Sequence, residues 1–409
     1  MPTAAAGWSR PFRVSQPFTL DVLPTQVALS SDGAAGFGLS VVDTDAPSNA
    51  TAYVVTREPS GQIGSAQAVP AVQQVLGLAY AAGGLELLTA SSKTGDACCG
   101  SAGVVRLGQR FGSVRMLVGG LAGATQGALI PVSGRLVAAV ATERGVWVAQ
   151  SSRGAEFSRA HQLTSADARP ETFSAAPLAA GSAIVVWAQR DKGNADPRTV
   201  YIAQGTAKTA PLKRHPAISV ASTHRIDEVA AAGRGGPTIA WIESWFDKQG
   251  AYHSQVEVAD VSHPRQARAF SVSGQIASDL SFTTDAKGDQ LLAWKTCTRS
   301  GACSVRQAVR RAGARFIGPG RLGSIESTEA PSAALAPSGA GVIAWITRGD
   351  VLASELGAGA TRPGSPQTVS GAGLATDLVV QAGPSGTALA AWSQGVLAPE
   401  VVGAIDRIG

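Results

Sequence analysis

The residues best suited to binding chemistry lie in the segment Trp241-Ile-Glu-Ser-Trp-Phe-Asp247, where Trp245 stands between two acids, Glu243 and Asp247. An aromatic ring beside carboxylates is a common arrangement in sugar sites, because the ring stacks on a pyranose face and the acids accept hydroxyl hydrogens. The segment therefore indicates a ligand-binding surface. The competing interpretation is that Trp245 only caps the edge of a sheet.

Other charged residues follow apolar segments that are equivalent to the one ending at Trp241. We include four of them as candidate ligand-binding residues: Arg190, Asp191, Lys295 and Arg348. The second candidate function below pairs Asp191 with Glu243 as acid and base.

The four cysteines form two pairs in sequence. Cys297 and Cys303 are separated by five residues, a spacing that places them across a hairpin, where a disulfide would staple the loop. Cys98 and Cys99 are adjacent, so they form either a strained vicinal bond or a bridge to another group. A stapled loop indicates an oxidising compartment; the competing interpretation is a redox switch.

The motifs of the common catalytic and metal sites do not occur in the sequence. We find no Gly-x-Ser-x-Gly nucleophile elbow, no His-Glu-x-x-His and no paired Cys-x-x-Cys. The five histidines do not share a metal-ligand spacing. We therefore predict no catalytic set, no bound metal and no cofactor.

Two motifs recur eight times each, with a period of about 50 residues. The first is a glycine followed six residues later by an apolar residue: Gly33 to Leu39, Gly84 to Ala90, Gly134 to Val140, Gly181 to Trp187, Gly235 to Trp241, Gly288 to Trp294, Gly339 to Trp345 and Gly386 to Trp392. The second is an apolar residue or a proline followed, after five intervening residues, by another apolar residue, as at Phe316 and Leu322. Alternating stretches lie between the two motifs, so each unit predicts four short antiparallel strands.

A four-stranded unit of this kind cannot bury both of its faces alone, but it can when arranged radially against its neighbours. We therefore predict an all-β chain that forms a single β-propeller of eight blades, with seven as the alternative if the degenerate second unit fails to form one. The five tryptophans of the first motif are expected to fill the gaps between blades. The predicted repeats are 22–70, 71–120, 121–168, 169–221, 222–274, 275–325, 326–371 and 372–409, the last completed by an N-terminal strand within 11–20.

The units Ser338-Gly-Ala-Gly-Val-Ile-Ala-Trp345 and Ser385-Gly-Thr-Ala-Leu-Ala-Ala-Trp392 resemble the repeats of exported bacterial β-propeller proteins, which are distantly similar to the sialidase and WD-repeat superfamilies. The resemblance covers nearly the whole chain. It implies the propeller fold and export from the cell, but its motifs specify the blade and not a ligand.

Composition limits the partners. The chain has 34 basic and 29 acidic residues, a net charge of +5 that is too dilute over 409 residues to indicate nucleic-acid binding. No apolar run reaches the roughly 18 residues that a membrane span needs. We expect a monomer that binds a glycan or a protein. The location predicted is extracellular or at the cell surface, with the cytoplasm as the alternative.

Three functions fit this sequence. The preferred one is a non-catalytic binding or scaffold propeller, exported, that recognises a glycan or protein partner through loops on one face. The second is a propeller glycoside hydrolase or lyase that uses paired carboxylates such as Glu243 and Asp191. The third is an intracellular platform for protein interactions, which four reduced thiols in the native protein would favour.

Overall fold

The computed structural model describes most of the chain. The described residues are 7–408 apart from 43–49, 82–83, 92–100, 109–110, 113, 118–120, 152–155, 166–167, 179–180, 191–195, 207–211, 234–235, 371–373 and 397–398.

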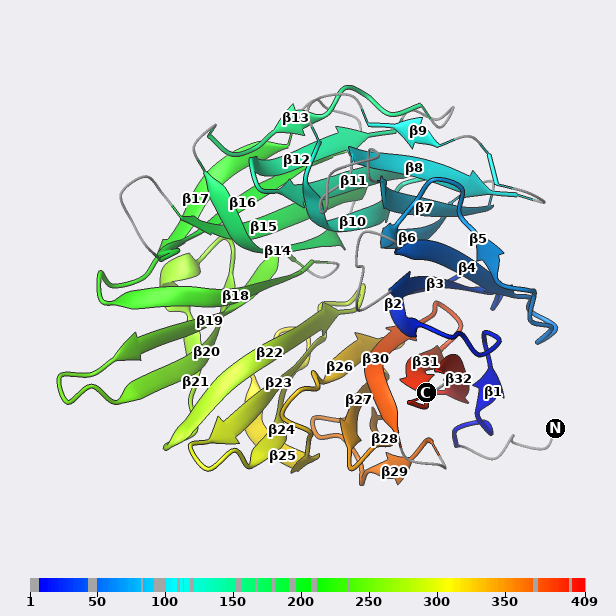
Figure 1. The fold of residues 1–409 in the computed structure, drawn as a ribbon. Coiled ribbons are helices and arrows are strands. Elements are labelled where there is room, and N and C mark those ends of the chain that lie inside the picture. Colours follow the sequence, from blue (N-terminus) through cyan, green and yellow to red (C-terminus); the bar gives the residue numbers. More distant parts are fainter. Residues whose placement is uncertain are drawn as a thin grey trace.

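The chain folds into an eight-bladed β-propeller (Figure 1). Each blade is a four-stranded sheet in which every neighbouring pair of strands is antiparallel. The second unit forms a complete blade, so the seven-bladed alternative is wrong. We number the blades 1 to 8 in chain order and call the four strands of each blade first to fourth, from the centre of the ring outward.

The first strands line the centre: β2 (Asp21–Leu29), β6 (Gln74–Ala81), β10 (Ala124–Val132), β14 (Arg169–Leu178), β18 (His224–Ala232), β22 (Gln275–Thr284), β26 (Ser332–Leu335) and β30 (Ala375–Ala382). The second strands are β3 (Ala35–Val42), β7 (Gly84–Ser91), β11 (Arg135–Thr142), β15 (Ser182–Arg190), β19 (Thr238–Phe246), β23 (Gln290–Thr298), β27 (Gly341–Thr347) and β31 (Thr387–Gln394).

The third strands are β4 (Thr51–Arg57), β8 (Ser101–Leu107), β12 (Gly145–Gln150), β16 (Thr199–Thr206), β20 (Tyr252–Asp260), β24 (Cys303–Arg310), β28 (Asp350–Leu356) and β32 (Glu400–Arg407). The fourth strands are β5 (Gln67–Ala68), β9 (Arg115–Met116), β13 (His161–Gln162), β17 (Lys213–Ser219), β21 (Arg268–Phe270), β25 (Ile317–Ser324), β29 (Gln367–Thr368) and, in blade 8, β1 (Phe12–Arg13).

The recurring glycines that the structure describes lie at the turns between first and second strands. Gly339 and Gly386 have φ angles of 87° and 74°, a region that side chains with a Cβ rarely occupy. These turns lie on one face of the ring, which we call the lower face. The hairpins between second and third strands and the connections between blades lie on the opposite, upper face.

The N-terminal strand closes the ring, as the sequence predicts. β1 pairs with β32, and Phe12 lies opposite Gly403. The Ser15 hydroxyl accepts a hydrogen bond of 3.0 Å from the N–H of Val401, and Arg13 forms a 2.5 Å ion pair with Glu400. Blade 8 is therefore built from both ends of the chain, which removes an open sheet edge.

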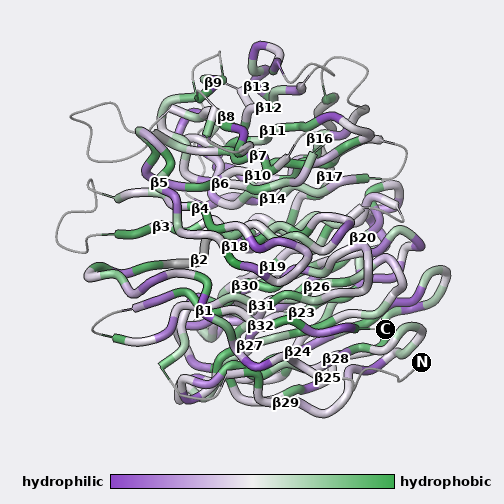
Figure 2. The backbone as a smooth tube through the Cα atoms, turned by 90° about the vertical axis from the view of Figure 1, so that its right-hand side faces the viewer, coloured by the Kyte–Doolittle hydropathy of each residue, from purple (hydrophilic) through white to green (hydrophobic). Residues whose placement is uncertain are grey.

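Apolar clusters fill the eight interfaces between successive blades, and the five motif tryptophans lie in them, each packed against the preceding blade. Trp345, for example, packs on Leu291, Ala293 and Val305 of blade 6. The predicted role of these tryptophans is confirmed. Figure 2 shows hydrophobic residues recurring along the strands of successive blades.

The first strands also contact one another all the way round the ring, from β2 to β30 and back to β2. Side chains link their backbones across the interfaces. At three interfaces, a first-strand serine accepts a hydrogen bond from a backbone N–H of the next blade. Each serine lies opposite the residue that precedes the motif tryptophan. The bonds are Ser174 from Ala231 (3.1 Å), Ser281 from Ala333 (3.0 Å) and Ser332 from Val380 (3.0 Å). These bonds satisfy donors that strand pairing leaves free.

A pair of acids lies in the interface between blades 7 and 8. Glu355 of β28 and Asp406 of β32 each have a carboxylate oxygen shielded from solvent. Burial, together with a hydrogen bond to Asp406 and its charge, raises the pKa of Glu355 to about 7. The pair therefore holds a proton at pH values where an exposed glutamate has lost it.

This pair predicts how stability depends on pH. Because the folded-state pKa of Glu355 lies above the unfolded value, its favourable contribution is complete below about pH 4.5 and is lost as the pH rises through 7. We expect Glu355→Gln to gain stability relative to the parent at pH 8, by about 1 kcal/mol after solvent screening, and to gain nothing at pH 4. Urea unfolding at both pH values measures this, and an equal effect at both would contradict it.

Candidate functional site

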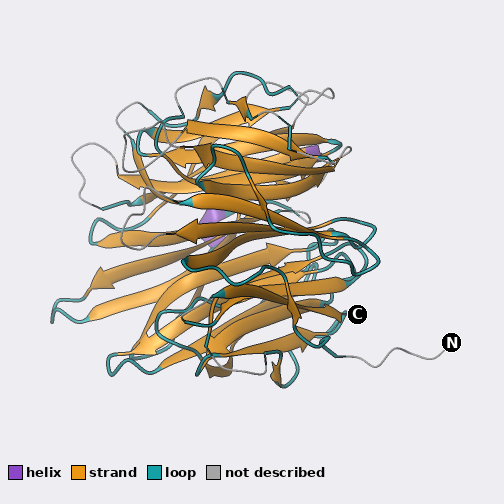
Figure 3. Cartoon of the chain, turned by 45° about the vertical axis from the view of Figure 1, so that its right-hand side comes forward, coloured by secondary structure: helices purple, strands orange, loops and turns teal. Residues whose placement is uncertain are grey.

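The candidate site lies at the tip of blade 5, where the hairpin of β19 and β20 projects from the ring (Figure 1). Figure 3 shows that strands make up nearly all of the regular structure around it. The turn of this hairpin is held by Asp247, whose Oδ1 accepts hydrogen bonds from the N–H groups of Gln249 (2.9 Å) and Ala251 (2.8 Å). Side chains alternate along the two strands, so the tip presents one set of residues toward blade 4 and another toward blade 6.

On the side toward blade 4, three rings stack across three strands. His224 lies opposite Trp245, and Trp245 lies opposite His253. The ring centroids are 4.6 Å apart for His224 and Trp245, with an angle of 11° between the planes, and 5.6 Å apart for Trp245 and His253, with 18°. Because β18 and β20 flank β19, one imidazole covers each face of the indole. Trp245 is thus the centre of a stack and not an open platform for a sugar.

A carboxylate bonds to each imidazole of the stack. His224 Nδ1 contacts Glu243 Oε1, and His253 Nε2 lies 2.8 Å from Asp247 Oδ2. The hydrogen bond from His253, followed by the one from the Ala251 N–H, lowers the pKa of Asp247. Glu243 is buried and its charge contributes, after burial itself, to the raised pKa of Glu257 on β20.

Comparison between blades shows that Glu243 has an unusual partner. In blades 4 and 8 the indole N–H of the motif tryptophan donates to the glutamine two residues later, over 2.8 Å in both Trp187–Gln189 and Trp392–Gln394. Glu243 holds the same position after Trp241, but its Oε1 contacts His224, and the buried Trp241 Nε1 has no hydrogen-bond partner. The carboxylate is therefore directed to the stack and not to the core tryptophan; the Trp345 indole N–H of blade 7 also lacks a partner.

On the side toward blade 6, Phe246 lies against Tyr252 with 5.1 Å between centroids in an edge arrangement. Phe246 is 65% exposed, an unusual state for a phenylalanine. The Tyr252 hydroxyl donates to Asp227 Oδ2 over 3.3 Å, and Arg225 pairs with Asp227 Oδ1 at 2.5 Å. Burial raises the pKa of Tyr252, so the phenol stays a neutral donor at physiological pH.

Acidic residues continue from Asp227 around the upper mouth of the ring. Bulges in the first strands leave Glu171, Asp227, Asp279 and Asp377 out of the pairing with the second strand. Glu329, just before β26, accepts a 3.2 Å hydrogen bond from the Asp377 N–H. The carboxylates thus form an arc over blades 4 to 8.

Two of the other predicted binding residues, Arg190 and Lys295, pair with carboxylates of this arc. Arg190 pairs with Glu171 at 2.6 Å. Lys295 is buried, pairs with Asp279 at 2.6 Å and donates to the carbonyls of Ser327 (2.7 Å) and Glu329 (3.0 Å).

Arg348 lies at the turn between β27 and β28, where its N–H donates to Glu326. Asp191 lies outside the described residues. The structure therefore brings Glu243, Trp245 and Asp247 together at one tip and places Arg190, Lys295 and Arg348 on blades 4, 6 and 7.

Sequence reasoning missed His224, Tyr252, His253 and Glu228. Glu228 accepts the N–H of Leu280 with both carboxylate oxygens at 3.0 Å and so ties blade 5 to blade 6. Burial raises its pKa to about 7. His224 and His253 each lie one strand away from Trp245, and the cross-strand register that joins them to it appears only when the hairpin is aligned.

The cysteine pair in blade 6 is confirmed as a disulfide. Cys297 and Cys303 lie directly opposite each other on β23 and β24, with an S–S distance of 2.06 Å. Cys98 and Cys99 lie outside the described residues.

Across the described part of the chain, no cluster of three or more His, Cys, Asp or Glu side chains is arranged to hold a metal, and no helix is long and apolar enough to cross a membrane.

No protein-family model and no curated protein matches this chain. Solved structures do. The Dos1 propeller matches with a TM-score of 0.58 at 10% identity, covering 98% of this chain and 95% of that one. A PL25 polysaccharide lyase, an ulvan lyase bound to -[GlcA(1-4)Rha3S]-, matches with 0.55 at 11%, covering 96% and 95%. The polysaccharide lyase Uly1 matches with 0.52 at 8%, covering 94% and 90%. At these identities the similarity shows the propeller fold alone.

The disulfide gives a test of how the hairpin in blade 6 is held. Removing it in the double variant Cys297→Ser/Cys303→Ser frees a short loop, for which chain entropy predicts a loss of about 2 kcal/mol in the free energy of unfolding. Urea unfolding measures the loss, and wild-type protein in reductant must lose the same amount. Unchanged stability in both samples would show that the sheet alone fixes this hairpin.

Proposed function

We propose that this chain is a binding propeller that recognises a glycan through the tip of blade 5 on its upper face. The observation that carries the proposal is the exposed Phe246 beside the hydrogen-bonding groups of Tyr252, Asp227 and Arg225. An open aromatic ring next to fixed donors and acceptors is the usual composition of a sugar-binding surface. Phe246 thereby takes the stacking role first assigned to Trp245.

The opposite side of the tip supports a binding role in a different way. The His224–Trp245–His253 stack, with Glu243 and Asp247 at its ends, holds five polar or aromatic side chains in fixed orientations. Such preorganisation lowers the entropy lost when a ligand binds. His253 and Asp247, whose side chains are partly exposed, are suited to sugar hydroxyls. Asp247 therefore remains a proposed ligand-binding residue, and we propose that the buried Glu243 contributes by orienting His224.

A second candidate is a polysaccharide lyase. Two imidazole–carboxylate pairs on one side of a single blade are a combination that general acid–base catalysis uses. Two of the similar folds are described as polysaccharide lyases. Incubation with uronate-containing polysaccharides, followed by the ultraviolet absorbance of unsaturated products, tests this candidate; activity that is lost in His224→Ala would replace the binding proposal.

We also propose that the protein works outside the reducing cytoplasm, since the Cys297–Cys303 disulfide needs an oxidising compartment to persist. Thiol counting on protein from its native source tests this. A disulfide intact in that sample supports export, and fully reduced thiols would favour the intracellular platform instead.

A glycan array with two matched variants tests the binding site. Phe246→Ala removes the exposed ring of blade 5, and Leu374→Ala removes an apolar side chain that is 57% exposed on the upper face of blade 8. We expect Phe246→Ala to weaken binding by about tenfold and Leu374→Ala to leave it unchanged, because only the first side chain adjoins the polar groups of the tip.

The triple variant Glu243→Ala/Trp245→Ala/Asp247→Ala extends the test to the stack, with circular dichroism as the check on folding. Binding that survives both Phe246→Ala and a folded triple variant would overturn the assignment to blade 5. A blank array would shift the proposal to a protein partner.

A further inference from the structure

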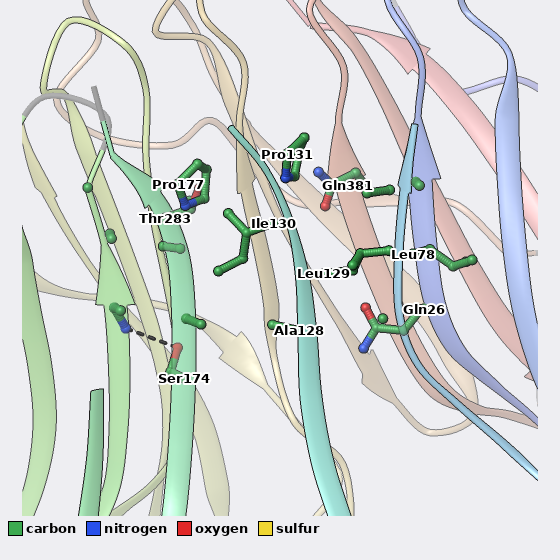
Figure 4. A pocket seen from close by; sticks show the side chains of 18 of the residues that line it. Gln26, Leu78, Ala128, Leu129, Ile130, Pro131, Ser174, Pro177, Thr283 and Gln381 are labelled. Carbon is green, nitrogen blue, oxygen red and sulfur yellow. Dashed lines mark hydrogen bonds between the residues drawn. The ribbon is translucent and has the colours of Figure 1, made fainter. Parts of the chain in front are cut away.

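A cavity of about 650 Å³ occupies the centre of the ring (Figure 4). Its lining comes from the second half of each first strand and continues to the turn that follows, so it lies toward the lower face, away from the tip of blade 5. All eight blades contribute to it. Its size falls within the range of about 300–1,000 Å³ that small-molecule sites occupy.

The described residues of the lining carry no charge. None of the described residues that line the cavity is an aspartate, glutamate, lysine, arginine or histidine. Tyr80 is its one titratable side chain, and burial together with the charge of Asp32 raises the pKa of Tyr80 to about 12, which keeps the phenol neutral. Any charged ligand would lose its hydration there without gaining a counter-charge, at a cost of several kcal/mol. The described lining therefore favours uncharged ligands.

Polar groups nonetheless converge on it. Gln26 of blade 1, Gln126 of blade 3 and Gln381 of blade 8 line it, and Gln126 and Gln381 are solvent-exposed although they lie at the centre of the molecule. Figure 4 shows Gln26 and Gln381 directed into the cavity. Thr283 and Thr284 of blade 6 also line the cavity. Each glutamine amide both donates and accepts hydrogen bonds, as a ligand rich in hydroxyl groups requires.

Aromatic and small residues complete the lining. Tyr80, Phe173 and Phe282 line it from three blades, with their side chains also packed against the clusters between blades, while alanines and glycines keep the space open. Ser174 also lines the cavity, but its hydroxyl is bonded to the Ala231 N–H, the dashed line in Figure 4. The Thr284 hydroxyl likewise donates to the Asp285 carbonyl over 3.0 Å. The groups left for a ligand are therefore the amides and the Thr283 hydroxyl, beside the three partly buried rings.

We propose that this central cavity is a second binding site, separate from blade 5, for an uncharged oligosaccharide held by Gln26, Gln126 and Gln381. Amides that bond hydroxyl groups beside aromatic rings are the chemistry of neutral-sugar recognition. The site opens toward the lower face, so it is independent of the glycan site proposed at the tip.

Calorimetric titration with neutral trisaccharides (maltotriose, cellotriose and xylotriose) and with trigalacturonate as the charged counterpart tests the proposal. We expect at least one neutral trisaccharide to bind and trigalacturonate to bind at least tenfold more weakly. The double variant Gln26→Ala/Gln381→Ala removes two hydrogen-bonding groups, so its affinity for the neutral trisaccharide should fall by about tenfold or more. Phe246→Ala, at the other face, should leave this affinity unchanged.

The outcomes separate the two sites. If none of the neutral trisaccharides binds at millimolar concentration, the cavity proposal is overturned, and the glycan site proposed at the tip of blade 5 is unaffected. Binding that Phe246→Ala abolishes and Gln26→Ala/Gln381→Ala does not affect assigns the ligand to the tip and also overturns it. Since both glutamines point into open space, the double variant should fold, and an unchanged melting temperature verifies this.

Discussion

Packing between blades is the interaction on which the rest of this protein depends. A four-stranded sheet has two apolar faces, and each blade here covers only one face of each neighbour. Burial is complete only when the ring closes, and closure depends on a two-residue strand, β1, from the opposite end of the chain. The free energy of every blade is therefore coupled to that of the next, as expected for a repeat array.

The same ring geometry determines which hydrogen bonds the polar side chains near the central axis form. A first strand pairs on one side only, so its other edge needs hydrogen-bond partners from neighbouring blades. Ser174, Ser281, Ser332 and Glu228 supply them, and Lys295 holds the connection that leads into blade 7. These residues have types that are common in functional sites, but their contacts bind blade to blade. Contacts, rather than residue type, separate them from the residues of the site.

Blade 5 differs, because some of its polar side chains contact one another instead of joining neighbouring blades. Its second and third strands extend into a projecting tip, and Glu243, which occupies the position of a tryptophan-bonding glutamine in blades 4 and 8, bonds a histidine instead. The buried indole N–H of Trp241 is left without a partner, as is that of Trp345 in blade 7, at a cost of about 1–3 kcal/mol each. The two ends of the axis also differ, since carboxylates form an arc over blades 4 to 8 at the upper mouth, while the described residues that line the cavity toward the lower face are uncharged.

The sequence by itself determined the propeller, its eight blades, the closure by the N-terminal strand and the disulfide. Each of these follows from local periodicity: alternation predicts strands, a glycine predicts a turn, and a bulky residue at a fixed place in every unit predicts interblade packing. Only the tertiary structure decided the site. Trp245 is covered on both faces because the register of β18 and β20 places His224 and His253 beside it, and this register depends on strand alignment rather than on any local pattern. The central cavity is likewise invisible in the sequence, because Gln26, Gln126 and Gln381 are far apart in the chain and meet only when the ring closes.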